Sequence, residues 1–124
     1  MSDKRDEFLE EILDCAGQGH AQFIELRGWS EKYGPGPNYT ILDDGIEEGR
    51  VQFPVTMDVV RKGFGLIAKA KSEGDGKTSI KYLHDEQRKL INEINKSNGD
   101  EGDYDVNDAM AIVEIGLWGE VVYG

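Results

Sequence analysis

The sequence predicts an α+β domain in which about four helices pack with a small antiparallel sheet of about three strands. Three observations lead to this fold class. The chain has a strongly apolar stretch near its C-terminus, amphipathic segments with a helical period, and a hairpin pattern between residues 39 and 55. With 124 residues, it is long enough for one domain, residues 1–124, with a substantial core.

The apolar stretch reads DVNDAMAIVEIGLWG and covers residues 105–119. On a helix its apolar side chains surround the axis, and only Glu114 interrupts them, so the helix must be buried at the centre of the fold. It is too short to cross a bilayer. Asp105 is a suitable N-cap. The following GEVVYG is rich in β-formers and predicts an edge strand.

Residues 3–16 predict an amphipathic first helix, with Ser2 as N-cap and Gly17 and Gly19 ending it. Apolar side chains gather on one face and acids on the opposite face. Bases occur only near the start of this helix, so the acidic side chains repel one another without relief from i,i+4 partners. The acids of the outer face are Asp3, Asp6, Glu7, Glu10, Glu11 and Asp14.

The middle of the chain alternates strands and loops. Residues 21–27 predict a strand, and residues 28–39 a loop, because prolines and glycines forbid regular structure there. Residues 39–42 and 50–55 predict a hairpin joined by the acidic turn DDGIEEG, with Pro54 on an edge strand. Thr56 should cap a helix that runs to about Lys71 and has the chain's only basic face.

The remaining segments are a loop at 72–78, a helix from about Asp85 within residues 79–97, and an acidic linker at 98–105. Charge is unevenly distributed. Residues 1–48 carry 12 acids and 4 bases, residues 49–97 carry 6 acids and 10 bases, and residues 98–124 carry 7 acids and no base. The net charge of −11 disfavours nucleic acid and anionic membranes as partners and favours a basic protein surface.

Cys15 is the single cysteine, so an internal disulfide is excluded and a reducing compartment is favoured. The N-terminus has no apolar signal segment, and no run is long enough for a transmembrane helix. We therefore expect a protein of the cytoplasm of whatever cell holds the gene. A homodimer is an alternative to a monomer, because the basic face of the helix that follows Thr56 can pair with an acidic element of the same molecule or of a second copy.

Motifs for metal, cofactor or catalysis are weak. GDGKT lacks the leading glycine of a phosphate-binding loop and follows a helix rather than a strand. Gly63, Gly65 and Ala68 match the dinucleotide-binding fingerprint poorly, because Val59 and Val60 precede them on the same predicted helix. Residues 103–114 match a calcium-loop template except at its required glycine, so calcium remains an alternative to helix capping. Cys15 is expected to be a packed thiol rather than a nucleophile paired with His20 or His84. We expect no metal and no cofactor.

One resemblance adds to this interpretation. The segments NGDEGDYDVNDAMAIVEIGLWGEVVYG and VTMDVVRKGFGLI resemble an uncharacterised family of small acidic proteins from phages and actinobacterial mobile elements. The resemblance covers about half of the chain, chiefly its C-terminal part, and its motifs are structural rather than catalytic. The resemblance implies that a phage or mobile element encodes the protein, which would then act in the cytoplasm of the host cell. Small acidic cytoplasmic proteins of this origin often inhibit host machinery.

The leading functional hypothesis is a non-enzymatic accessory protein that binds a basic protein partner through acidic side chains. The partner could be a host defence nuclease or another nucleic-acid-binding protein, inhibited by nucleic-acid mimicry. The expected binding residues are Glu7, Glu10, Glu11, Asp14, Asp43, Asp44, Glu47, Glu48, Asp100, Glu101 and Asp103.

A second hypothesis is that the protein binds a small, nucleotide-like anion through the aromatic and cationic side chains of residues 27–39. Packing of the same aromatic rings over the sheet edge is the structural alternative. An enzyme of unknown class is the third hypothesis, since no pair of carboxylates is marked out for acid–base chemistry. The ligand-binding residues of the second hypothesis are Arg27, Trp29, Lys32, Tyr33 and Tyr39.

Overall fold

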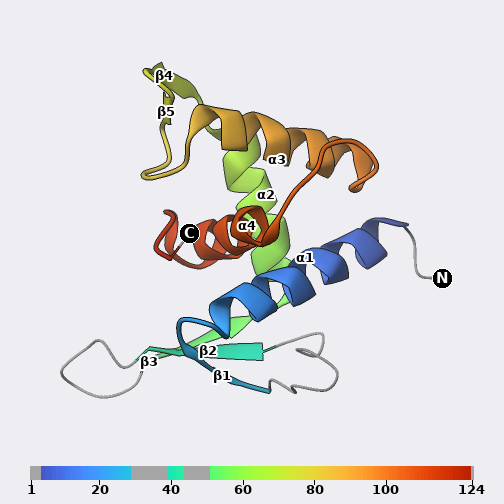
Figure 1. The fold of residues 1–124 in the computed structure, drawn as a ribbon, viewed down its shortest axis with the longest axis vertical. Helices are drawn as coiled ribbons and strands as arrows, with labels where there is room; N and C mark the ends of the chain where they lie inside the picture. The colour runs from blue at the N-terminus through green and yellow to red at the C-terminus, as the bar shows by residue number, and fades with distance from the viewer. Residues whose placement is uncertain (1–3, 29–38, 44–50, 124) are drawn as a thin grey trace.

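A computed structural model describes residues 4–28, 39–43 and 51–123 of the chain. Within these residues the fold comprises four helices and two antiparallel sheets, which confirms the α+β prediction (Figure 1). In chain order the elements are α1 (Lys4–His20), β1 (Glu25–Arg27), β2 (Tyr39–Asp43), β3 (Val51–Val55), α2 (Met57–Lys69), β4 (Ser72–Gly74), β5 (Lys77–Thr78), α3 (Asp85–Ser97) and α4 (Val106–Trp118).

Helix α4 is the centre of the fold, as the sequence predicts. Nine consecutive residues of this helix, 108–116, are buried. Figure 1 shows α4 in the middle of the molecule, between α3 on one side and α1 on the other, with α2 crossing it. Asp105 caps the helix by accepting a hydrogen bond from Asp108 N at 3.0 Å, and Asp108 accepts one from Asp105 N at 3.0 Å.

Two glycines allow α2 and α4 to cross at very short range. A Cβ atom on Gly63 would lie 2.0 Å from the backbone oxygen of Ile112, and a Cβ on Gly116 would lie 2.2 Å from the backbone oxygen of Val59. Only glycine fits at either position, because the obstructing atoms are backbone and cannot rotate away. Gly63 is therefore a helix-packing residue, which accounts for a glycine inside an otherwise good helix.

Helix α1 is longer than the sequence suggests. It continues through Gly17 and Gly19 to His20, so the predicted end at residue 16 is wrong. The reason is tertiary packing, since a Cβ on Gly19 would lie 2.3 Å from Met110 Sδ of α4. Glycine is selected here for close approach between helices and not as a helix terminator. Ser2, the expected N-cap, lies outside the described residues.

The three-stranded sheet has the order β1-β2-β3, and both pairs are antiparallel. The predicted hairpin is confirmed, and Pro54 lies on the edge strand β3 as expected. The predicted strand at 21–27 is shorter, because residues 21–24 continue helix-like turns in which Ile24 N donates to His20 O at 2.9 Å. Only Glu25–Arg27 pairs with β2.

Two further expectations need correction. Residues 72–78 form the hairpin β4–β5 rather than a plain loop, and Asp75 and Gly76 have positive φ values of 54° and 75°. Positive φ at both positions matches the Asp-Gly turn preferred between two strands. Residues 119–123 form no strand, because their amides have other acceptors. Val121 N donates to Lys81 O at 3.3 Å, and the amides of Val122 and Tyr123 donate to Glu114.

Candidate functional site

The outer face of α1 presents the acidic side chains that the sequence singles out. Glu7, Glu10, Glu11 and Asp14 are exposed, whereas the opposite face of the helix is buried in the core. Burial, and then the nearby charge of Glu10, raise the pKa of Asp14 above its ordinary value. Both causes disfavour the charged carboxylate of Asp14. At the start of the helix the charge of Asp6 is partly offset by Arg61 of α2, whose guanidinium lies 3.5 Å from it.

The segment after α3 lies directly against α1. Arg5 of α1 donates to the backbone oxygen of Asn95 at 2.9 Å, to Asn95 Oδ1 at 2.6 Å and to Asn98 Oδ1 at 3.1 Å. A Cβ on Gly99 would lie 2.9 Å from the ring of Phe8, so this glycine allows the chain to pass close over α1. The end of α3 and the start of the linker are thereby fixed to the first helix.

The aromatic ring of Tyr104 provides a second attachment. It meets the ring of Phe8 edge to face, with centroids 6.3 Å apart. Burial, and then the charge of Glu11, raise the pKa of the Tyr104 hydroxyl. The contact between the rings of Phe8 and Tyr104 places the end of the 98–105 linker against the first helix.

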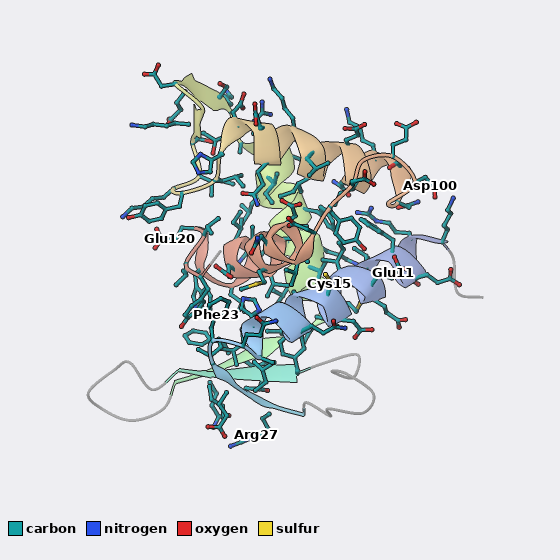
Figure 2. The ribbon with its side chains drawn as sticks, viewed as in Figure 1. Glu11, Cys15, Phe23, Arg27, Asp100 and Glu120 are labelled. Carbon is teal, nitrogen blue, oxygen red and sulfur yellow. The ribbon has the colours of Figure 1, made fainter. Side chains whose placement is uncertain are left out.

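These attachments bring two acidic segments from opposite ends of the chain into one surface. Glu7, Glu11 and Asp100 line the same depression, whose volume is about 190 Å³. Figure 2 shows Glu11 and Asp100 toward the same side of the molecule, away from Arg27 and Phe23 beside the sheet. We call this the acidic surface; its exposed acids are Glu7, Glu10, Glu11, Asp14, Asp100, Glu101 and Asp103.

Cations at the acidic surface are few among the described residues. Lys4 forms an exposed salt bridge with Asp100. Arg5 is engaged by Asn95 and Asn98, and its guanidinium also lies 5.8 Å from the ring centroid of Phe8 and 5.4 Å from that of Phe64. An exposed ion pair such as the Lys4 bridge contributes little to stability. The seven acids of this surface nevertheless outnumber Lys4 and Arg5, so its net charge is negative.

The structure does not describe the side chains of the remaining acids that were expected to bind a partner, those in and beside the DDGIEEG turn. Asp43 is the last residue of β2, but its side chain lies outside the described part of the chain, as do Asp44, Glu47 and Glu48. Whether the DDGIEEG turn adds to the acidic surface stays a prediction.

One of the five residues predicted for the 27–39 ligand site, Tyr39, is not available to a ligand. Tyr39 is buried in β2, 3% exposed, so its ring packs in the core and does not face a ligand. Burial raises the pKa of its hydroxyl far above the ordinary value. Arg27 is exposed at the end of β1, and Trp29, Lys32 and Tyr33 lie outside the described residues. Tyr39 is therefore a core residue of the central strand and does not cover the sheet edge, which was the structural alternative.

A buried polar pair was missed by reasoning from the sequence. His20 and Glu114 are both fully buried, and His20 Nε2 lies 2.8 Å from Glu114 Oε2. Val122 N and Tyr123 N each donate to Glu114 Oε1 at 2.6 Å. The position of Glu114 inside the apolar run was visible in the sequence, but its partner His20 could not be named because 94 residues separate the two.

Through these contacts Glu114 connects helix α4 to the end of α1 and to the C-terminal tail. Because its oxygens are engaged in this way, Glu114 does not close a calcium shell with residues 103–107. No group of three or more histidine, cysteine or acidic side chains suited to a metal ion occurs among the described residues. Cys15 is half-buried against the core, and burial raises the pKa of its thiol.

Three comparisons with known proteins were negative. No family model, curated protein or solved structure matches the chain. Among the described residues, no helix is both long and apolar enough to span a membrane.

Proposed function

We propose that the protein binds a basic surface on a partner protein through its acidic surface, in a role of binding rather than catalysis. The observation that supports this most strongly is the convergence of two acidic segments. The outer face of α1 and the 98–105 linker lie together, and Arg5, Gly99 and Tyr104 hold them in place. A fixed array of carboxylates attracts a cationic partner more effectively than the same charges dispersed over a chain.

The electrostatic cost of this surface in the unbound protein favours the same proposal. Glu7 and Glu11, and likewise Glu10 and Asp14, are spaced i,i+4 on one helix face, where like charges are destabilising. Lysines or arginines of a partner would remove that repulsion on binding. They would also be steered toward the surface over distances of about 8 Å at physiological ionic strength.

The kind of partner we propose is a nucleic-acid-binding protein, with a host defence nuclease as the leading case. Such proteins have a basic cleft that holds phosphates, and regularly placed carboxylates can occupy it as a nucleic-acid mimic. The resemblance of the C-terminal sequence to small acidic phage proteins supports an inhibitory role. No described side chain favours the 27–39 ligand site over this proposal, since Tyr39 is buried.

The test is capture of partners from lysate of the native cell on immobilised protein, followed by elution with increasing salt. The parent is compared with a variant carrying Glu7→Gln, Glu11→Gln and Asp100→Asn, all within the depression. We expect the parent to retain a nucleic-acid-binding protein that added DNA displaces, and the variant to lose it at lower salt.

A matched control keeps the same change in net charge. Glu73→Gln, Asp75→Asn and Glu86→Gln neutralise three exposed acids on the hairpin β4–β5 and on α3, away from the acidic surface. If the control loses the partner as readily as the acidic-surface variant, net charge alone governs binding and the proposed surface is wrong. Equal retention by all three proteins would also contradict the proposal.

A further inference from the structure

A groove of opposite character lies at the other end of the molecule, where the hairpin β4–β5 meets the start of α3. It has a volume of about 440 Å³, within the range of small-ligand sites in proteins. Its wall is almost continuous in sequence, consisting of Glu73 and residues 77–84. This groove shares no residue with the acidic surface.

The groove has more basic than acidic side chains in its wall. Lys77 and Lys81 line it together with His84, against the single acid Glu73. Both lysines are exposed, and within the described part of the chain neither of them forms an ion pair. A local positive site in a chain of net charge −11 is well suited to hold an anion.

Tyr82 supplies a ring beside these cations. Its side chain is 66% exposed, and Lys81 Nζ lies 5.1 Å from the ring centroid. Its backbone has φ of 68°, a left-handed conformation that is uncommon for a bulky residue. Tyr82 is thus an exposed aromatic side chain that packing does not require, at a position where glycine or asparagine would suit the backbone better.

Hydrogen bonds hold the turn that presents this ring. Leu83 N donates to Ile80 O at 3.1 Å and closes the turn. The buried hydroxyl of Thr78 accepts from Ile80 N at 3.2 Å and lies 3.1 Å from Ile80 O and 2.9 Å from Leu83 O, to one of which it donates its proton. Asp85 N donates to Gly76 O at 2.9 Å, which fixes the hairpin to α3. A wall held in this way binds a ligand with little ordering cost.

From these features we propose that the groove binds a small molecule of the nucleotide type, with a planar ring and a phosphate. The ring stacks on Tyr82, and the phosphate lies between the ammonium groups of Lys77 and Lys81. The Glu73 carboxylate accepts a hydrogen bond from a sugar hydroxyl. Recognition would thus combine stacking on an aromatic ring with binding of an anion by two ammonium groups. This proposal does not depend on the acidic surface.

The test is an NMR titration of the uniformly ¹⁵N-labelled full chain with adenosine 5′-monophosphate. Expected shifts are confined to amides of residues 73–84 and saturate with a dissociation constant below about 1 mM. Adenosine and inorganic phosphate, added separately, should bind at least about tenfold more weakly, because each lacks one of the two contacts. Equal binding of phosphate alone, or of adenosine alone, would overturn the proposal.

Two variants locate the site. Tyr82→Asn suits the left-handed backbone, so it should keep or raise the melting temperature while weakening nucleotide binding at least about fivefold. Lys77→Gln with Lys81→Gln should weaken it at least as much. The matched control is Lys62→Gln with Lys69→Gln, an equal charge change on the exposed basic face of α2. An absence of saturable shifts, or equal weakening by the control, contradicts the proposed site.

Discussion

Glu114 and the glutamates of α1 show how differently one residue type behaves in two regions of this molecule. Glu114 is fully buried in α4 and is matched by the His20 ring and by two backbone amides. Glu7, Glu10 and Glu11 lie exposed on α1. The buried acid has a partner for each oxygen and holds the structure together, because a buried charge is tolerated only when it is hydrogen-bonded. These three glutamates remain in contact with solvent, so ionisation costs them far less than it costs a buried acid.

The difference suggests how to separate stability from function in this chain. Removing the buried carboxylate should destabilise the fold strongly, since it leaves the His20 ring without its hydrogen-bond partner and the amides of Val122 and Tyr123 without their acceptor. Removing exposed carboxylates should leave the fold intact and act on binding. The predictions below test each side of this comparison, beginning with the largest expected effect.

The largest effect is expected for Glu114→Ala, which should lower the free energy of unfolding by about 3 kcal/mol or more. Chemical denaturation followed by circular dichroism would measure it. Glu114→Gln is the matched control, because an amide oxygen can still accept from Val122 N and Tyr123 N, and it should cost clearly less than alanine.

A double-mutant cycle with His20→Ala would then isolate the histidine contact, with an expected coupling of about 1–3 kcal/mol. If Glu114→Ala and Glu114→Gln both changed the free energy of unfolding only slightly, the carboxylate would have no structural role. The contrast between Glu114 and the exposed glutamates of α1 would then be wrong.

The smallest effect, and one of opposite sign, is expected for Asp14→Asn. Burial and Glu10 raise the pKa of Asp14, so ionisation of this carboxyl destabilises the folded state, and acidification through its pKa restores that stability. At pH 7 the variant should therefore be more stable by a few tenths of a kcal/mol, limited by solvent screening.

Measured at acid pH, where Asp14 is protonated in both states, the gain of Asp14→Asn should disappear. A stability loss at pH 7, or a gain that persists on acidification, would contradict the assignment of Asp14 to a repulsive surface.

The sequence predicts the helices better than their ends. The burial of α4 follows from its apolar side chains, and the caps at Thr56 and Asp105 follow from their residue types. The end of α1 could not be read locally, because Gly19 fits against Met110 of a helix distant in sequence. The C-terminal tail has the composition of a strand. It does not form one because the amides of Val122 and Tyr123 donate to the Glu114 carboxylate and not to a neighbouring strand.

The candidate site was predicted in part. The acids of α1 and of the 98–105 linker could be named from the sequence, but their convergence depends on Arg5, Gly99 and Tyr104, whose contacts are tertiary. The groove beside Tyr82 was not anticipated, since it arises from a hairpin and a left-handed turn in a stretch expected to be irregular. Periodicity carries no information about such turns.

The central claim, that the acidic surface attracts a basic partner, is tested most directly by association kinetics with the captured partner. Rate constants would be measured at low and at physiological salt for the parent, for the Glu7→Gln, Glu11→Gln, Asp100→Asn variant and for its matched control. At low salt we expect association of the acidic-surface variant to be slower by about tenfold, a difference that shrinks as salt rises, with the control close to the parent. Equal association rates for parent and acidic-surface variant at low salt would contradict the claim.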